Sequence, residues 1–294
     1  MDEVDEILGT NNKQNNKRYN SYKNQDDWKQ RQQQDRQEIY NSMDKMSKLV
    51  SKDNMKFQQY LDLQSKFTKY SVGNCLVILE KAPYITQIRD KKSWQDKGVS
   101  LIDNAKPIKI LEPSKSSNGR TYYNPKDVYD ISQTTATKPS DIDYDTRKLL
   151  ESVIYTSNVP RKSVEQLPDG TTGALYNKEE NVLYVCKNMD KETLFQSLFQ
   201  EMASIEMKSD EDNDLKYFRS YCVSYMMCRR FGIDTFNYSF DNIPQEISEK
   251  QEPKDIRREL EIIRGKFESI NSRMVDYLQK DNNEKVKRKS IPER

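Results

Sequence analysis

Residues 198–207, LFQEMASIEM, determine how the second half of the chain is interpreted. Apolar residues recur at helical spacing through this stretch and just before it, so the pattern predicts a helix with one side packed in a core. The apolar residues are Leu194, Phe195, Leu198, Phe199, Met202, Ala203 and Ile205. Asp190 precedes the helix and is placed to cap its N-terminus. A single carboxylate, Glu201, lies near the middle of the stretch.

Glu201 follows Gln200 and precedes Ser204 by three residues. In a zinc metallopeptidase helix of the form His-Glu-x-x-His, histidines at these two places share one face and hold the metal. The chain contains no histidine in its 294 residues. An amide and a hydroxyl are poor zinc ligands and do not lower the pKa of a bound water enough for attack near neutral pH. We therefore expect no metal, no cofactor and no catalytic residue, with Glu201 a vestige.

Residue periodicity outside this helix predicts an α+β fold. Apolar residues at three- and four-residue spacing predict further helices. They lie at 27–50, 57–67, 71–82, 144–156, 214–231 and 253–280. Short β-branched or aromatic runs separated by turn-forming residues predict strands at 107–112, 121–133, 174–176 and 182–187. Gly232 is suited to the left-handed position that ends the 214–231 helix.

Composition divides the chain into four segments. Residues 1–26 are rich in Asn, Lys, Gln and acids, which bury too little apolar surface to order a chain, so disorder is expected. Residues 27–139 and 140–280 are the two predicted domains, joined by the linker-like TTATKPSD at 134–141. Residues 281–294 form a basic tail.

Charge is unevenly distributed between the two predicted domains. Residues 51–140 hold 15 Lys and Arg against 9 Asp and Glu, whereas residues 141–250 hold 13 against 20. A positive excess confined to one half favours an anionic partner for that half and argues against nucleic acid on the other.

The remaining sequence features exclude several classes of protein. No run of about 18 apolar residues predicts a membrane span, and the acidic start is unlike a signal peptide, so a cytoplasmic protein is expected. The four cysteines form no CxxC pair, which favours buried reduced thiols. No phosphate-binding glycine motif is present, and without histidine there is no Ser-His-Asp or Cys-His arrangement.

Several ordered motifs resemble one known family. The stretch at 67–113 carries Tyr-Ser-x-x-Asn, an apolar-x-x-Pro segment, a Trp and a strand ending in Pro, followed by YNPKDVYDISQT. It resembles the N-terminal single-stranded-DNA-binding domain of ArdC-type antirestriction proteins. GALYNKEENVLYV, LFQEMASIE and YCVSYMMCRRFGIDTFNYSF resemble the zincin-like C-terminal domain of the same family, as found in LtrC-like proteins of mobile elements.

The resemblance implies a fold and a set of site positions. It implies a helix-rich N-terminal domain with a small sheet, then a zincin-like α+β domain. The family's two histidine ligands fall on Gln200 and Ser204, and its acidic third ligand falls on Tyr221, so all three metal ligands are missing. Cys222 follows Tyr221, but adjacent helical residues point about 100° apart. We expect Gln200, Ser204 and Tyr221 to close the polar face by hydrogen bonding one another.

Proteins that bind single-stranded DNA with little sequence preference use a positively charged groove and exposed aromatic rings on which the bases stack. The residues expected to do so are Tyr70, Asn74, Trp94, Lys97, Lys106, Lys109, Arg120 and Tyr122. The alternative is that Tyr70 and Trp94 are core aromatics and the lysines form an ordinary solvated surface.

Two functional hypotheses follow. In the first, the chain is a single-stranded-DNA-binding protein of a conjugative or other mobile element, with an antirestriction or DNA-transfer role and a catalytically inactive metallopeptidase-like domain. Its partners would be single-stranded DNA and proteins of a transfer or replication apparatus, with no membrane. In the second, it is a protein-interaction scaffold, a pseudopeptidase that does not bind DNA.

Overall fold

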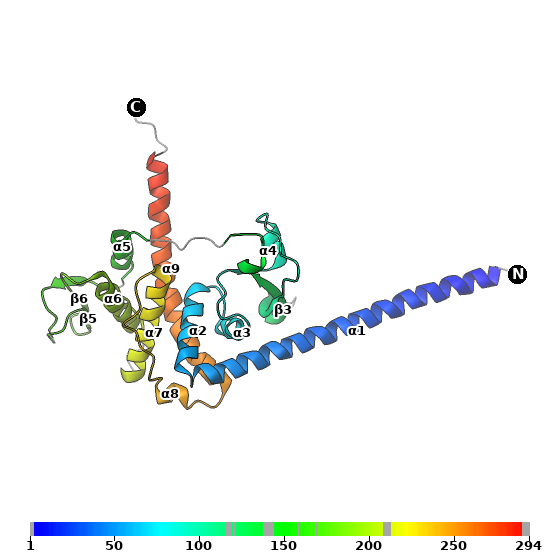
Figure 1. The fold of residues 1–294 in the computed structure, drawn as a ribbon, viewed down its shortest axis with the longest axis horizontal. Coiled ribbons are helices and arrows are strands. Elements are labelled where there is room, and N and C mark those ends of the chain that lie inside the picture. The colour runs from blue at the N-terminus through cyan, green and yellow to red at the C-terminus, as the bar shows by residue number, and fades with distance from the viewer. Residues whose placement is uncertain are drawn as a thin grey trace. The chain divides into compact units, whose positions relative to one another are not determined.

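The computed structural model shows a mixed α+β protein, which confirms the predicted fold class (Figure 1). Backbone and side chains are described for residues 26–114, 119, 121–137, 144–157, 159–168, 170–207 and 213–280, and backbone alone for 3–25, 115 and 281–289. The side chains of residues 1–25 and 281–294 lie outside the described residues. The backbone of residues 3–25 belongs to the helix α1 (Glu3–Val50), where the sequence predicts disorder, and the backbone of residues 281–289 continues the helix α9 (Pro253–Lys289) into the predicted basic tail.

Contacts divide the chain into two compact units. The first unit combines residues 1–43 with 87–136, and the second combines residues 44–86 with 137–294. Residues from the predicted domain of 27–139 therefore contribute to both units. The long helix α1, Glu3–Val50, has residues in each.

The first unit contains a three-stranded sheet in the order β1-β3-β2. β2, Ile108–Lys115, and β3, Thr121–Asp130, form an antiparallel hairpin, and β1, Ile88–Arg89, pairs with the end of β3. The helix α4, Lys91–Gln95, begins at Asp90, whose carboxylate accepts a hydrogen bond from the Ser93 N–H at 2.7 Å. That bond holds the pKa of Asp90 down to about 2. The 3₁₀ turn η1, Ile131–Gln133, follows β3.

The second unit contains a sheet in the order β4-β6-β5. β5, Ala174–Asn177, and β6, Val182–Cys186, form the predicted antiparallel hairpin. β4, Arg161–Val164, pairs in parallel with β6 and was not predicted, because its polar, mostly exposed residues show no apolar alternation.

The helices of the second unit fall close to the predicted ranges, except for the short α8, which was not predicted. They are α2, Asn54–Lys66; α3, Val72–Lys81; α5, Thr146–Thr156; α6, Lys191–Glu206; α7, Asn213–Phe231; α8, Gln245–Ser248; and α9, Pro253–Lys289. The predicted cap at Asp190 is confirmed, since its carboxylate accepts from the Thr193 N–H at 2.8 Å. Gly232 has a φ of 70°, as predicted for the residue that ends α7.

The apolar face of α9 is the core of the second unit (Figure 1, orange to red). Six of its side chains are completely buried, and Leu278 is 8% exposed. The six are Ile256, Leu260, Ile263, Phe267, Ile270 and Met274. α3, α5, α6 and α7 all contact this helix. The helix predicted at 253–280 is therefore the element around which the other helices of the unit are packed.

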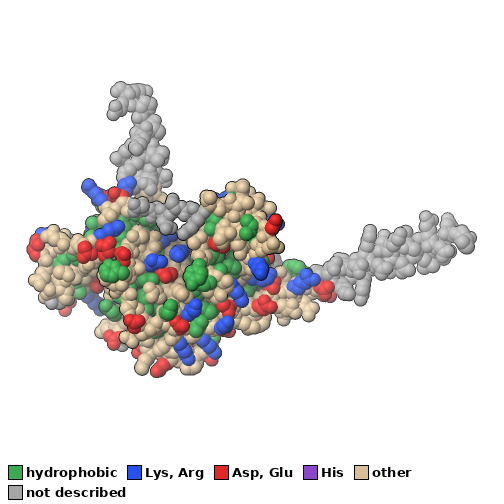
Figure 2. All heavy atoms as spheres, viewed as in Figure 1, with side chains coloured by type: hydrophobic (Ala, Val, Ile, Leu, Met, Phe, Trp, Pro, Cys, Tyr) green, Lys and Arg blue, Asp and Glu red, His purple; other side chains and the backbone are tan. Residues whose placement is uncertain are grey.

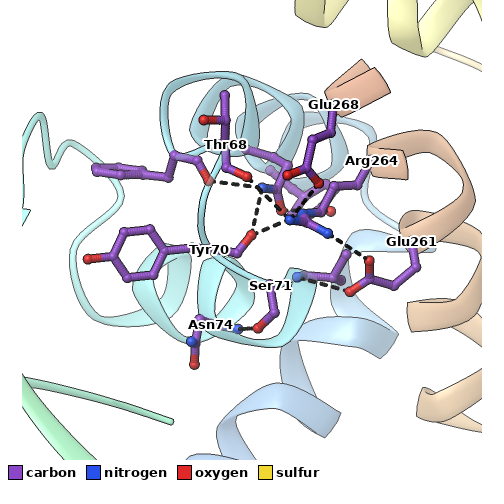
Figure 3. A network of polar contacts seen from close by, with 11 residues as sticks. Thr68, Tyr70, Ser71, Asn74, Glu261, Arg264 and Glu268 are labelled. Carbon is purple, nitrogen blue, oxygen red and sulfur yellow. Dashed lines mark hydrogen bonds and ion pairs between the residues drawn. The ribbon is translucent and has the colours of Figure 1, made fainter. Parts of the chain in front are cut away.

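Arg264 on α9 holds the loop between α2 and α3 (Figure 3). Its Nε donates to the Tyr70 carbonyl at 3.0 Å and its Nη2 to the Thr68 carbonyl at 3.3 Å. Glu268 and Glu261 form ion pairs with the same guanidinium at 2.9 and 3.3 Å. Glu261 also accepts from the backbone N–H of Val72 at 3.3 Å, so α9 fixes both the loop and the start of α3.

The described residues also bear on two expectations about environment. All four cysteines are free and buried, as expected. In the described part of the chain, no helix has both the length and the apolar composition needed to cross a membrane.

Phe267→Ala should destabilise the folded chain by about 3–5 kcal/mol, because it deletes a completely buried ring where several helices meet. Urea unfolding followed by circular dichroism measures the change. The matched control is Phe236→Ala, since Phe236 is 77% exposed and its loss should change the free energy of unfolding by no more than about 0.5 kcal/mol. Equal effects of the two substitutions would contradict the central position of α9.

Candidate functional site

The frame of a metallopeptidase helix is present in α6. Its apolar side is buried as predicted, through Phe195, Leu198, Phe199, Met202 and Ala203. Glu201 is only partly buried, on the polar side of the helix. The sequence pattern therefore placed the core side of the helix correctly, except that Leu194 and Ile205 at its margins are only partly buried.

Glu201 bonds the edge of the neighbouring sheet. Its Oε2 accepts a hydrogen bond from the backbone N–H of Tyr176 at 3.0 Å. Tyr176 lies on β5, an edge strand whose one partner among the described strands is β6. An edge strand leaves N–H groups without a partner in the sheet, and the carboxylate supplies one here. Burial raises the pKa of Glu201, while the Tyr176 N–H and Lys216 act in the opposite direction.

Tyr221, at the third ligand position, is occupied with other contacts. Its hydroxyl accepts from the backbone N–H of Ser239 at 2.9 Å. Its ring packs on Tyr238 and Phe240, with ring centroids 4.8 and 5.5 Å apart. Burial raises the pKa of Tyr221, so the phenol is neutral near pH 7.

The expected hydrogen bonding among the three degenerate positions is wrong. The Tyr221 hydroxyl bonds Ser239, and within the described residues no side-chain hydrogen bond joins Gln200 or Ser204 to Tyr221 or to each other. The reason is that Tyr221 packs into an aromatic cluster with the segment after α7, which the helical pattern alone did not reveal.

These side chains do not fit a catalytic zinc. An amide, a hydroxyl and a neutral phenol lack the imidazole, thiolate or carboxylate character that zinc requires. Cys222 is completely buried, and burial raises the pKa of its thiol well above the ordinary value, which disfavours the thiolate. Among the described residues no group of three His, Cys, Asp or Glu side chains could hold a metal ion. No catalytic step through a metal follows from this site.

Comparison with solved structures finds the family that the sequence motifs resemble. Two crystal structures of the antirestriction protein ArdC from the R388 plasmid are similar to this chain. The Mn(II)-bound form has a TM-score of 0.42 and 13% identity over 72% of this chain and 84% of that one. The metal-free form has a TM-score of 0.45 and 12% identity over 70% and 86%. No protein-family model and no curated protein matches the sequence.

Two of the expected DNA-contacting residues lie in the second unit. Tyr70 is half-buried, with its ring edge-on to Phe67 at 5.7 Å. Asn74 is 7% exposed, in the first turn of α3, and its N–H donates to the capping hydroxyl of Ser71 at 3.3 Å. Figure 3 shows that Arg264 bonds the Tyr70 carbonyl, so α9 fixes the backbone just before the capping residue Ser71.

Trp94 lies in the core of the first unit. It is 2% exposed, its Nε1 donates to the Tyr129 carbonyl at 3.0 Å, and the Arg89 guanidinium lies over its ring at 5.5 Å. The indole therefore has no face available to stack on a base in this structure.

The predicted cations have different surroundings. Lys97 and Lys106 are exposed and form no ion pair with a described carboxylate. Lys109 instead pairs with Asp35 at 3.0 Å and Asp127 at 3.1 Å, so its charge is compensated. Arg120 lies outside the described residues. On the face drawn in Figure 2, Lys and Arg side chains are interspersed with Asp and Glu side chains.

The hairpin of the first unit has aromatic side chains in water. Tyr122 and its neighbour Tyr123 each expose 48% of their surface near the turn between β2 and β3. Arg36 on α1 bonds this part of β3, donating from Nε to the Tyr123 carbonyl at 3.0 Å and from Nη2 to Asn124 Oδ1 at 3.3 Å. Sequence reasoning missed Arg36, because nothing local to residue 36 indicates a partner 87 residues away.

Glu201→Ala should cost about 1–3 kcal/mol in the free energy of unfolding, because it leaves the Tyr176 N–H without its acceptor. Glu201→Gln is the matched control. Its amide oxygen still accepts that bond, so stability should stay within about 0.5 kcal/mol of the native chain. Both variants should bind oligonucleotides as the native chain does. A Gln variant that is fully stable but has lost an activity would show that the carboxylate is functional.

Proposed function

We propose that this chain binds single-stranded DNA through its first unit. The observation that carries the proposal is the pair of exposed tyrosines at the β2–β3 hairpin, Tyr122 and Tyr123. Large aromatic side chains are usually withdrawn from water, whereas proteins that bind single strands keep them exposed as stacking platforms worth about 1–3 kcal/mol per base.

Uncompensated cations support the same interpretation. Lys97 and Lys106 are exposed in the first unit without an ion pair to a described carboxylate. Residues 87–136 hold 9 Lys and Arg against 6 Asp and Glu. A strand of phosphates gains from such charges because counterions are released when a lysine neutralises a phosphate.

The biological role follows from the motif resemblance. ArdC-type and LtrC-like proteins belong to mobile elements, so we assign this chain an antirestriction or DNA-transfer role in the cytoplasm. Proteins of the transfer or replication apparatus would be its further partners. Glu201 and Tyr221 each accept a hydrogen bond from a backbone N–H, which supports a scaffolding, non-catalytic role for the second unit.

A protein-interaction scaffold without DNA binding is the second candidate. It is favoured by Tyr217, which is 62% exposed and stacks on Tyr221 with the rings 6.3 Å apart and 18° from parallel. An exposed aromatic beside the degenerate ligand position would suit a bound polypeptide, because tyrosine is enriched at protein interfaces.

Retardation or fluorescence anisotropy of a labelled oligothymidylate with the full chain tests the proposal. The full chain is needed because α2 packs on α7 and α3 packs on α9. A fragment ending near Pro139 would lose both contacts. Lys106→Gln should flatten the slope of log affinity against log salt by about 0.7, the contribution of one phosphate on a single strand. Lys109→Gln should flatten it less, since Asp35 and Asp127 already compensate that lysine.

Tyr122→Leu is the complementary variant. It should weaken binding with little change in the salt slope, because stacking releases few counterions. If the folded native chain binds no oligonucleotide at low salt, the DNA proposal fails and the scaffold takes its place.

A further inference from the structure

A cavity of about 300 Å³ lies in the first unit between α1 and the hairpin. Its lining residues are Trp28, Lys29, Gln32, Gln33, Arg36 and Asn124. Five of the six come from α1, where Trp28, Gln32 and Arg36 follow one another at intervals of four residues and so share one face of the helix. None of these residues was singled out by the DNA interpretation of the sequence.

Three contacts from two adjacent residues attach α1 to the hairpin. Arg36 donates to the Tyr123 carbonyl and to Asn124 Oδ1, and the adjacent Asp35 pairs with Lys109 on β2 at 3.0 Å. Because α1 and β3 are held together at Arg36, a recess is left beside this contact. Trp28 lies two turns of α1 closer to the N-terminus. The cavity is thus a consequence of named contacts within one unit.

The lining side chains of the cavity are of three chemical kinds. There is one indole, 61% exposed; two cations, Lys29 and Arg36; and three amides, Gln32, Gln33 and Asn124. No carboxylate and no aliphatic side chain is among them. Arg36 forms no ion pair with a described carboxylate, and Lys29 has only Asp26 at 3.7 Å.

The amides retain hydrogen-bonding capacity. Neither Gln32 nor Gln33 makes a side-chain hydrogen bond to a described residue. Asn124 accepts from Arg36 through Oδ1, and no described residue accepts from its Nδ2. An amide presents both a donor and an acceptor, which is the pattern on the exposed edge of an unpaired base.

We propose that this cavity binds one nucleotide of the single strand, with its base stacked on Trp28 and its edge bonded by the amides of Gln32, Gln33 and Asn124. Lys29 and the free side of the Arg36 guanidinium face the adjoining phosphate. The inference rests on the proposed single-stranded-DNA binding and adds a specific subsite to it. An apolar peptide side chain would find no aliphatic group among the described lining residues, and an acidic ligand without a ring would leave the indole unused.

Tryptophan fluorescence gives a direct test, because the chain has only two tryptophans, Trp28 and the buried Trp94. In the full-length Trp94→Phe variant, addition of an oligothymidylate should quench the remaining Trp28 emission in parallel with binding measured by anisotropy. Unfolding by urea checks that the variant is folded. If it does not fold, the native chain is compared with Trp28→Phe, and the quenching should be absent in the latter.

Affinity measurements with matched variants complete the test. Trp28→Leu should weaken oligothymidylate binding about 5- to 150-fold, the loss of one stacked base. Tyr40→Leu is the control, since Tyr40 is an exposed aromatic on the same helix that does not line the cavity, and it should leave affinity unchanged. Gln33→Ala should weaken binding, whereas Gln34→Ala, one residue outside the lining, should not.

The outcomes separate this inference from the proposal on which it rests. If the native chain binds no oligonucleotide, both fail. If the native chain binds, but Trp28→Leu binds equally well and Trp28 is not quenched, the cavity is not a nucleotide subsite while DNA binding stands. Equal losses from Trp28→Leu and Tyr40→Leu would also overturn the inference, because the effect would then belong to the helix and not to the cavity.

Discussion

The complete burial of one face of α9 is the constraint on which the second unit depends. Six side chains from Ile256 to Met274 have no exposed surface, and four helices pack on them. Charged groups on the same helix fix where its neighbours lie. Arg257 pairs with Asp44 at 2.6 Å, Arg264 holds the loop after α2, and Arg273 pairs with Glu206 at the end of α6.

A buried ion pair also joins α9 to a neighbouring helix. Arg219 on α7 is 6% exposed and pairs with Glu259 of α9, which is 8% exposed. A buried pair of this kind is costly to break, because removing one partner leaves the other charge without compensation. The helix α7 is therefore attached to α9 by charge as well as by apolar contact.

Local patterns in the sequence predicted much of this fold. The period of apolar residues placed α9 and α6, a capping aspartate placed the start of α6, and Gly232 marked the end of α7. The departure of Gln200 and Ser204 from the His-Glu-x-x-His pattern is also visible in the sequence, because that pattern is confined to five residues.

Properties that depend on distant partners were left open or were missed. The sequence analysis offered a buried Trp94 only as an alternative, because its burial depends on β1 and β3. The neutralisation of Lys109 was missed, because it depends on Asp35, 74 positions earlier in the chain. Residues 51–86, with 5 Lys and Arg against 3 Asp and Glu, belong by contact to the second unit, so the charge division seen in the sequence does not follow the units. A list of cations and aromatics identifies which residues are able to bind DNA, and only packing shows which are free to do so.

The most direct test of the central claim, that DNA is held by the first unit, is photochemical cross-linking of the full chain to oligothymidylate, with the cross-linked peptides identified by mass spectrometry. Our account predicts cross-links in residues 28–36 and 121–124, where the exposed indole and the two exposed tyrosines lie. It predicts none in α6 or α7. Cross-links concentrated in α6 and α7, with none in those two segments of the first unit, would contradict it.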